Sequence, residues 1–401
     1  MITDFETNKV FLSALLKTNK YEYFWKELER ILEKHSIKPE FIENTRDIWC
    51  RDYMPVQIGE KEYVQFKYFP DYYVNHKYIK RLTIQEQLQY LKPDNIKLID
   101  LIVDGGNIVK SKNKAIMTEK VFKENKNRSR KSVVDTLLKA LRIDELYFIP
   151  VQPYDLTGHA DGMVRFYDEN TLLVNKFVQE TASWRKKLKY ALDKTRLNIV
   201  EFPYIPSNEK YEGEWTAKGC YINYAQIGNL IIFPQFNINE DGNALRSIKE
   251  LFPEPAYHVE PIDATDVAKE GGVLNCLTWN TYKPIIHNAI DYLLPLYGDE
   301  NSMLVIHKDD TNAINDALCV RLSPKDKEIK TAWSIQKTLK HIEPIDGIST
   351  EDIDGAKSIL TKYYSSEELS DILESLSSPT KIAMVELMEV PPRLKNYKPK
   401  N

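Results

Sequence analysis

The sequence predicts a mixed α/β protein built from a repeated structural unit. Along roughly the first 280 residues the same order recurs: helix, strand, a polar or glycine-rich turn that we call the elbow, then two short strands. The elbows carry Asp52, Asp104, His159, Asn223 and Cys276, which lie 52, 55, 64 and 53 residues apart. A supersecondary unit repeated at about 50 residues is typical of a closed circular array with all elbows on one face. Plain α/β alternation is the alternative.

The composition is that of a soluble globular protein and disfavours several classes. With 401 residues, 42% hydrophobic and 28% charged, the chain can form one large domain, or one large domain and a smaller one. A net charge of -4 gives no electrostatic case for binding nucleic acid or an anionic membrane. Met1 to Lys20 lacks the apolar region of a signal peptide, and no run approaches the ~18 to 20 apolar residues of a membrane span.

The four cysteines, Cys50, Cys220, Cys276 and Cys319, are widely spaced, without a CxxC pair or a disulfide framework. Such spacing favours a reducing compartment, because disulfide-stabilised folds normally use denser and paired cysteines. We therefore expect a cytoplasmic protein.

Helical periodicity predicts the helices of the repeat. Within Tyr21 to His35, Phe24, Leu28, Ile31 and Leu32 fall on one face. Similar patterns predict further helices over Leu82 to Leu91, Lys131 to Leu141, Thr181 to Thr195 and Asn243 to Leu251.

Short apolar or alternating runs predict the strands between these helices. The expected strands are Lys9 to Leu16, Val56 to Ile58, Tyr63 to Phe69, Ile96 to Val103, Ile108 to Val109, Lys114 to Thr118, Leu146 to Val151, Met163 to Tyr167, Thr171 to Asn175, Asn198 to Phe202, Cys220 to Ala225, Leu230 to Pro234 and Ala256 to Ile262. The last elbow, Glu270 to Trp279, combines a glycine pair with the apolar run Val273 to Leu277. If this run is a strand, Asn275 faces away from Cys276.

The pattern changes beyond Tyr282, and we expect two parts, residues 1–285 and residues 286–401. The second part is expected to be mainly helical with short strands, and its apolar helix faces must be buried against something. We expect it to pack on the first part and to limit access to the site or contact a partner; a separate domain that only adds stability is the alternative. The expected elements are helices over Ile285 to Leu293, Ile329 to Ile342, Thr350 to Tyr363 and Ser366 to Leu376, a strand over Met303 to His307, and an apolar segment over Ile382 to Val390.

Four elbow side chains are candidates for chemistry: Asp52, His159, Asp161 and Cys276. His159 and Asp161 are two residues apart, so on an extended segment they point the same way. A metal pair is disfavoured, since a metal site needs further ligands and the other histidines lie in undistinguished settings. Two simpler interpretations stay open: a structural histidine with Asp161 capping a turn, and a buried cysteine after a glycine turn.

Used together, these side chains suit a guanidinium substrate. Two carboxylates can grip this planar cation through charge-assisted hydrogen bonds. A thiolate can then attack its central carbon while a histidine protonates the departing amine, without a metal or an organic cofactor. In an empty pocket the two carboxylates should raise the pKa of Cys276, because like charge disfavours the thiolate, and a bound guanidinium should cancel this effect.

Five motifs occur in a familiar order. They are Trp49-Cys50-Arg51-Asp52, Asp104-Gly105-Gly106-Asn107, Gly158-His159-Ala160-Asp161, Tyr221-Ile222-Asn223-Tyr224 with Pro234-Gln235-Phe236, and Gly271-Gly272 followed by Cys276. With these motifs, roughly residues 5 to 282 resemble the agmatine deiminase and bacterial (Porphyromonas-type) peptidylarginine deiminase family of guanidine-modifying enzymes.

The resemblance implies a five-bladed, pseudo-symmetric α/β propeller of ββαβ-type units, followed here by the α-rich extension. It also implies that Cys276 is the nucleophile and His159 the general acid/base. Asp52 and Asp161 would bind the guanidinium, and Trp49 would help to wall the site. Asn107 lies at an elbow and could contact substrate, or its motif could form only a tight turn.

The resemblance implies a cytoplasmic, cofactor-independent deiminase that converts agmatine to N-carbamoylputrescine and ammonia through a thiouronium intermediate on Cys276, within polyamine biosynthesis. Family members usually have a histidine where this chain has Asn275, a longer glycine run than Gly271-Gly272, and a glutamate in place of Asp104. The alternatives are a deiminase of free or peptidyl arginine, an amidinotransferase, or an inactive binding module. The C-terminal segment could support a homo-oligomer or contact a protein partner.

Overall fold

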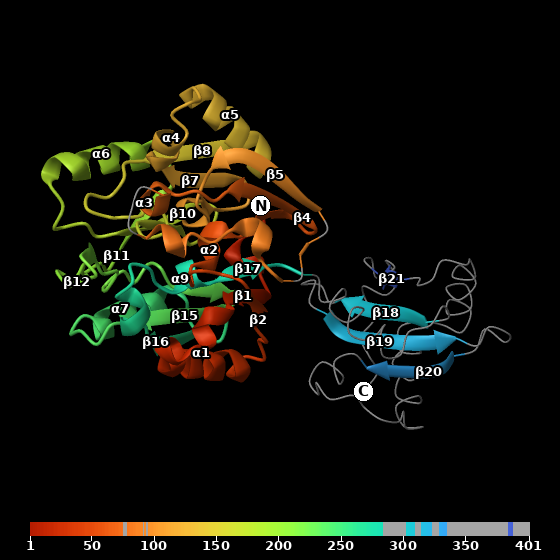
Figure 1. Cartoon of the computed structure of the whole chain (residues 1–401). Helices are drawn as coiled ribbons and strands as arrows, with labels where there is room; N and C mark the ends of the chain where they lie inside the picture. Colours follow the sequence, from red (N-terminus) through yellow and green to blue (C-terminus); the bar gives the residue numbers. More distant parts are fainter. Residues whose placement is uncertain are drawn as a thin grey trace. The chain divides into compact units, whose positions relative to one another are not determined.

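The computed structural model describes residues 1–283 except residues 75–77, 91 and 94, together with four strands in the remainder of the chain (Figure 1). The chain forms two compact units, Met1–Lys283 and Pro284–Asn401. Within the described residues, no helix is long and apolar enough to cross a membrane.

Five sheets of the first unit share one pattern, in which the second strand is antiparallel to the first and parallel to the third. They are β17 (Trp279–Thr281), β1 (Lys9–Ser13) and β2 (Glu40–Ile42); β3 (Val56–Gly59), β4 (Glu62–Lys67) and β5 (Asn95–Ile102); β6 (Val109–Lys110), β7 (Lys114–Thr118) and β8 (Glu145–Ile149); β9 (Val164–Phe166), β10 (Thr171–Asn175) and β11 (Asn198–Phe202); and β14 (Ala225–Ile227), β15 (Leu230–Gln235) and β16 (His258–Asp263). The repeat expected from the elbow spacing is thus visible in the strand order. A separate hairpin pairs β12 (Lys210–Tyr211) with β13 (Glu214–Trp215).

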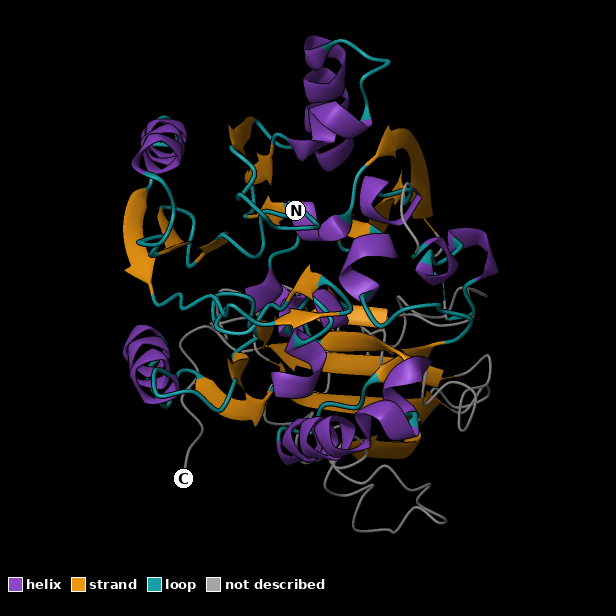
Figure 2. Ribbon diagram, turned by 60° about the vertical axis from the view of Figure 1, so that its left-hand side comes forward, coloured by secondary structure: helices purple, strands orange, loops and turns teal. Residues whose placement is uncertain are grey.

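Helices connect the parallel strands in most of these sheets and lie at the periphery of the first unit, with the strands further in (Figures 1 and 2). They are α1 (Glu22–Lys34), α4 (Lys120–Glu124), α5 (Arg130–Leu141), α6 (Ala182–Asp193) and α7 (Asp241–Leu251). On α1, the apolar side chains Phe24, Leu28, Ile31 and Leu32 are all buried, as the periodicity predicted.

The sheet that contains β1 joins the two ends of the first unit. Lys9, Val10 and Phe11 pair antiparallel with Thr281, Asn280 and Trp279. This pairing brings the end of the first unit, directly after Cys276, next to its beginning.

Three predicted elements of the first unit are wrong. The strand expected over Cys220 to Ala225 is a turn that leads into β14, which begins only at Ala225. Cys276 lies in the short helix α9 (Leu274–Leu277) rather than on a strand; so short an apolar run has no period that separates the two structures. Where a helix was expected over Leu82 to Leu91, the described residues 82–90 contain only the 3₁₀ turn Gln85–Gln87. Here the Gln85 carboxamide bonds the backbone of Tyr53, Phe66 and Tyr68, which fixes an irregular connection.

In the second unit the structure describes a four-stranded sheet in the order β20-β19-β18-β21. The strands are β18 (Ser302–Lys308), β19 (Ile314–Leu322), β20 (Ile329–Ser334) and β21 (Met384–Leu387). The helix expected from Ile329 is therefore wrong at its start, because Ile329, Thr331 and Trp333 recur at the period of a strand. The helices expected over Ile285 to Leu293, Thr350 to Tyr363 and Ser366 to Leu376 lie outside the described residues.

Candidate active site

Four of the five elbow residues, Asp52, His159, Asn223 and Cys276, line one cavity of about 290 Å³ in the first unit. Its lining includes Trp49, Asp52, His159, Asp161 and Cys276, which are five of the side chains singled out in the sequence. They come from different repeats: α2 (Cys50–Tyr53) carries Asp52, the loop before β9 carries His159 and Asp161, and α9 carries Cys276. The sheets and their elbows thus bring together groups far apart in the chain.

Cys276 lines the cavity and lies against two acceptor groups. Its Sγ is 3.7 Å from Asp161 Oδ2 and 3.3 Å from Asn223 Oδ1. Burial, together with the negative charges of Asp161 and Asp52, raises the pKa of the thiol well above its usual value. This is the direction expected for a thiol beside two carboxylates.

The His159 ring lies between two carboxylates. Its Nε2 is 2.8 Å from Asp104 Oδ2, and its Nδ1 is 3.6 Å from Asp52 Oδ1. Burial disfavours the charged ring, but Asp52 and Asp104 outweigh it and raise the pKa of His159 to about 9. The ring is therefore an imidazolium near neutral pH, ready to donate a proton.

The two acids beside His159 differ in proton affinity. Burial would raise the pKa of Asp104, but Lys120 and the histidine lower it to about 2. Burial raises the pKa of Asp52 to about 7. The positive charge of His159 acts to lower this pKa, and the negative charges of Asp104 and Asp161 act to raise it. Asp104 therefore stays anionic near neutral pH, and a cation that approaches Asp52 would favour its ionised form.

Gly106 allows Asp52, His159 and Asp161 to lie close together. Its N–H donates to Asp52 Oδ1 at 2.9 Å, and its carbonyl accepts from the Asp161 N–H at 3.1 Å. A Cβ at this position would lie 2.7 Å from both Asp52 Oδ1 and His159 Nδ1. Only glycine leaves room for the acids and the imidazole to come together here.

Trp49 is held against the cavity wall by backbone and ring contacts. Its N–H donates to Asp47 Oδ1 at 2.9 Å. A Cβ at Gly272 would lie 2.6 Å from the indole ring, so the glycine pair of the last elbow allows this close packing.

Asn107 is the sequence-predicted site residue that the structure places elsewhere. It is absent from the lining of the cavity, and its Oδ1 accepts from the Thr118 N–H at 2.9 Å and from the Thr118 hydroxyl at 3.0 Å. The substrate contact expected from Asn107 is therefore replaced by a contact that secures the neighbouring strand.

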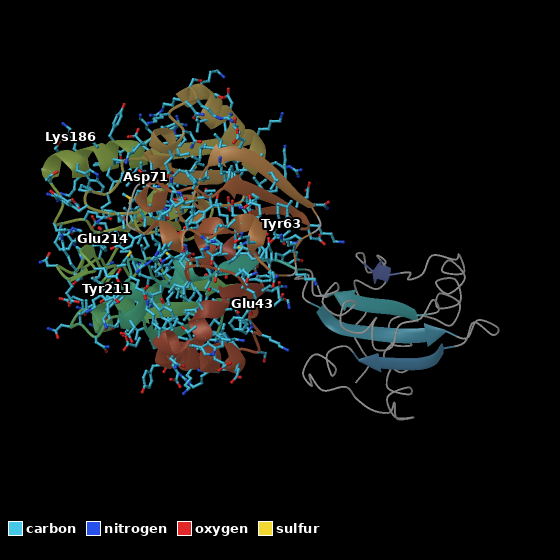
Figure 3. All side chains as sticks on the ribbon, viewed as in Figure 1. Glu43, Tyr63, Asp71, Lys186, Tyr211 and Glu214 are labelled. Carbon is cyan, nitrogen blue, oxygen red and sulfur yellow. The ribbon has the colours of Figure 1, made fainter. Side chains whose placement is uncertain are left out.

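The mouth of the cavity is aromatic and polar. Hairpin β12–β13 contributes Tyr211, Glu214 and Trp215, of which the first two are labelled in Figure 3. The hairpin is tied to the segment that precedes β5, because Arg81 pairs with Glu212 Oε2 at 2.8 Å. The opening is thus bordered by a tethered hairpin.

Sequence reasoning missed some of the residues that organise the site. Asp104 and Asn223 were recognised as elbows, but their contacts with His159 and Cys276 were not foreseen. Asn275 donates to Asp161 Oδ2 at 2.7 Å, and its place directly before the nucleophile was the available signal. Lys120 begins the basic stretch Lys120 to Lys131, which predicted a solvated loop or an anion site; Lys120 is instead buried on α4.

Among the described residues, no group of His, Cys, Asp and Glu is arranged to hold a metal ion. The arrangement instead provides a thiol, an imidazolium and two carboxylates that face a cavity able to admit a cation. Such a set can bind a guanidinium, attack its carbon and transfer protons.

Residues 2–281 match the model of the Porphyromonas-type peptidyl-arginine deiminase family. The chain belongs to this family. A curated family relative from Shewanella baltica, named "putative agmatine deiminase", is 24% identical over 209 residues, which cover 44% of this chain and 56% of the relative. The chain therefore spans about half the length of the curated relatives that it matches.

Solved structures show the same fold. The agmatine deiminase of C. jejuni aligns with a TM-score of 0.56 at 20% identity, covering 70% of this chain and 95% of that one. The agmatine deiminase of Enterococcus faecalis aligns with a TM-score of 0.52 at 15% identity, covering 71% and 95%. The first unit thus has the mixed α/β fold of the agmatine deiminase structures.

Proposed function

We propose that this protein is a cysteine-dependent deiminase that hydrolyses a guanidine C–N bond, with agmatine as the leading substrate. The observation that carries the proposal is the convergence of Cys276, His159, Asp161 and Asp52 on one cavity. Water is the second substrate, and the products from agmatine are N-carbamoylputrescine and ammonia.

Binding of the guanidinium prepares the nucleophile. Asp161 and Asp52 accept hydrogen bonds from the substrate, and its positive charge offsets the two acids that disfavour the thiolate. The Cys276 thiol then releases its proton to solvent. The thiolate of Cys276 is therefore favoured most when substrate is bound, and the free enzyme carries the protonated, unreactive thiol.

In the first chemical step the Cys276 thiolate forms a C–S bond with the guanidinium carbon. The imidazolium of His159 donates its proton to one terminal nitrogen, the C–N bond breaks and ammonia leaves. The remaining group is a thiouronium cation on Cys276, and His159 is now neutral.

In the second step neutral His159 takes a proton from water. The resulting hydroxide attacks the thiouronium carbon, and the neutral tetrahedral adduct expels the Cys276 thiolate. The hydroxyl proton of the adduct passes to this thiolate, which leaves a neutral ureido group and restores the Cys276 thiol. His159 is again an imidazolium, so the proton cycle closes without a cofactor.

Agmatine is the leading candidate substrate because curated relatives and solved structures carry the name agmatine deiminase. The cavity supports a substrate with a second cation, since Asp155 and Glu180 also line it. The family description names peptidyl arginine, so free and peptidyl arginine are the competing substrates within the same reaction class. An amidinotransferase would transfer the amidino group from Cys276 to an amine, which attacks the thiouronium carbon in place of water.

The architecture extends this proposal. The shared strand order of the five sheets and the pairing of β1 with β17 support a closed, five-bladed propeller. Residues 286–401 would then be an accessory segment that limits access to the site or binds a partner, including a second copy of the chain. The free thiols of Cys50, Cys220 and Cys276 suit a cytoplasmic enzyme.

The deciding experiment measures ammonia and ureido product with agmatine, free arginine and arginyl peptides at equal concentrations. We expect both products in equal amounts, with the highest kcat/KM for agmatine. An added amine acceptor tests the amidinotransferase. Absence of both products with every guanidine, from a protein that still binds a guanidinium ion, would favour the inactive binding module.

A further inference from the structure

A buried cation that the proposed steps do not use lies behind the His159 ring. Lys120, on α4, is 5% exposed. Its Nζ contacts Asp104 Oδ2 at 2.8 Å, Glu124 Oε1 at hydrogen-bonding distance and Asp71 Oδ1 at 3.7 Å. Asp71, labelled in Figure 3, lies on α3 (Asp71–Val74), and its N–H donates to Glu124 Oε1 at 3.1 Å.

Lys120 and His159 contact the same oxygen atom. Asp104 Oδ2 is 2.8 Å from Lys120 Nζ and 2.8 Å from His159 Nε2. The other oxygen, Oδ1, is buried without a hydrogen-bond partner among the described residues. The carboxylate is therefore held through one atom, and that atom is shared by the lysine and the imidazole.

This geometry bears on the proton cycle. Asp52 on α2 and Asp104 both face the ring and favour its charged form, while Lys120 is the facing cation; the Tyr72 ring packs at 6.0 Å. Two facing carboxylates alone would raise the proton affinity of the ring further than they do beside Lys120. The ring must donate a proton in the first step and accept one in the second.

We propose that Lys120 is a positioning residue that acts through Asp104. It fixes the carboxylate on His159 Nε2 and offsets its charge, so that one imidazole can serve both as acid and as base. The proposal rests on the deiminase mechanism above. Glu124 balances the charge of the lysine, which allows a buried cation at this place.

The test compares Lys120→Met with Lys123→Met. Lys123 lies on the same helix, but its side chain is 78% exposed and pairs with Asp71 Oδ2 at 2.7 Å. The pKa of His159 is measured by NMR of histidine-labelled full-length protein, with His159→Gln to assign the signal. We expect Lys120→Met to raise this pKa by about 1 unit, because it removes the facing cation. Lys123→Met should leave it unchanged.

The same variant also tests the second chemical step, in which neutral His159 takes a proton from water. In Lys120→Met the neutral ring is scarcer, so the thiouronium adduct should accumulate and be detected by intact-mass measurement during turnover of agmatine. Where the single variant does not unfold cooperatively, Lys120→Met/Glu124→Gln removes the lysine and its balancing acid together, and a smaller rise in the pKa is expected.

An unchanged or lowered His159 pKa in a folded Lys120 variant would overturn the proposal. The NMR result does not require turnover, so it also separates the two proposals. A wild-type protein that releases no ammonia contradicts the deiminase, while the titration still decides whether Lys120 offsets the charge of Asp104.

Discussion

Asn275 donates its side-chain N–H to Asp161 Oδ2 at 2.7 Å, the same carboxylate oxygen that lies 3.7 Å from the Cys276 sulfur. The Asn275 backbone N–H in turn donates to Asn223 Oδ1 at 3.1 Å. The residue before the nucleophile therefore orients one of the acids that would bind the guanidinium, while its own backbone is anchored in the neighbouring repeat.

Asn275→Ala should weaken substrate binding more than chemistry. Loss of a hydrogen bond to a buried charge costs about 1.5–3 kcal/mol, which corresponds to a KM increase of roughly tenfold or more. Steady-state kinetics with agmatine measure the change. Asn280→Ala is the matched control, because Asn280 is also buried and donates to the Gln226 carbonyl at 2.7 Å. It should lower the free energy of unfolding and leave KM unchanged; equal KM values in both variants would contradict the role of Asn275.

Cys276→Ala should lower turnover by roughly 10⁴-fold or more, because covalent catalysis has no substitute for the thiolate. Binding of a guanidinium ligand should persist, since Asp52 and Asp161 remain, and calorimetry measures it. Cys220→Ala provides the control, because Cys220 also lines the cavity but its sulfur donates to the Gly162 carbonyl. A Cys276→Ala protein with a near-normal rate would refute the nucleophile.

Gly106→Ala should lower kcat by about 100-fold, because the added methyl group must displace Asp52 or His159 from its place. Gly162→Ala is the control: this glycine lines the same cavity, yet the nearest atom to its added Cβ would be Cys220 Sγ at 3.9 Å. Rates and thermal unfolding are measured for both. Similar losses in the two variants would show that the close approach at Gly106 is unimportant.

His159 makes stability depend on pH in a defined window. Its folded-state pKa of about 9 lies above the ordinary value of 6.5, so the folded protein binds the proton more tightly than the unfolded chain. This contribution is complete below pH 6.5 and is lost as the pH rises through about 9. Urea unfolding of the wild type and His159→Gln across this range should show a difference that shrinks with rising pH. A constant difference would exclude the raised pKa.

Truncation after Lys283 should leave the first unit folded. Its five sheets are formed by residues before this position, and Lys283 still donates to Asn8 Oδ1 at 2.9 Å. If the remainder of the chain limits access to the cavity, arginyl peptides should become better substrates of the shortened protein. An unchanged substrate range would contradict that role, and an insoluble product would show that the two parts fold as one.

The spacing of chemistry-bearing residues predicted more of the site than any single motif. Asp52, His159 and Cys276 recur in phase with the strands, so their meeting in one cavity follows from the repeat. Which groups pair could not be predicted, because the contact between Asp104 and His159 depends on side-chain rotation at positions 55 residues apart. Asn107 illustrates the same limit: its elbow was identified, but its carboxamide turns toward Thr118.

Secondary structure was predicted best where the periodic pattern was long. The thirteen residues of α1 present a continuous apolar face, whereas the four residues of α9 cannot show a helical period. At Ile329 the alternation typical of a strand was overlooked in favour of the charged helical pattern that follows. Polar contacts to the backbone, as at Gln85, leave no periodic signal at all.

The pairing of β1 with β17 also constrains how the protein is made. The strand Lys9–Ser13 emerges early from the ribosome, but its partner Trp279–Thr281 is synthesised about 270 residues later. Until then the first sheet lacks one strand, and the edge of β1 that β17 will cover must stay unpaired or be shielded. The nascent chain would therefore depend on protection of this edge, and the thiol of Cys276 would reach its partners only in the last moments of the unit's synthesis.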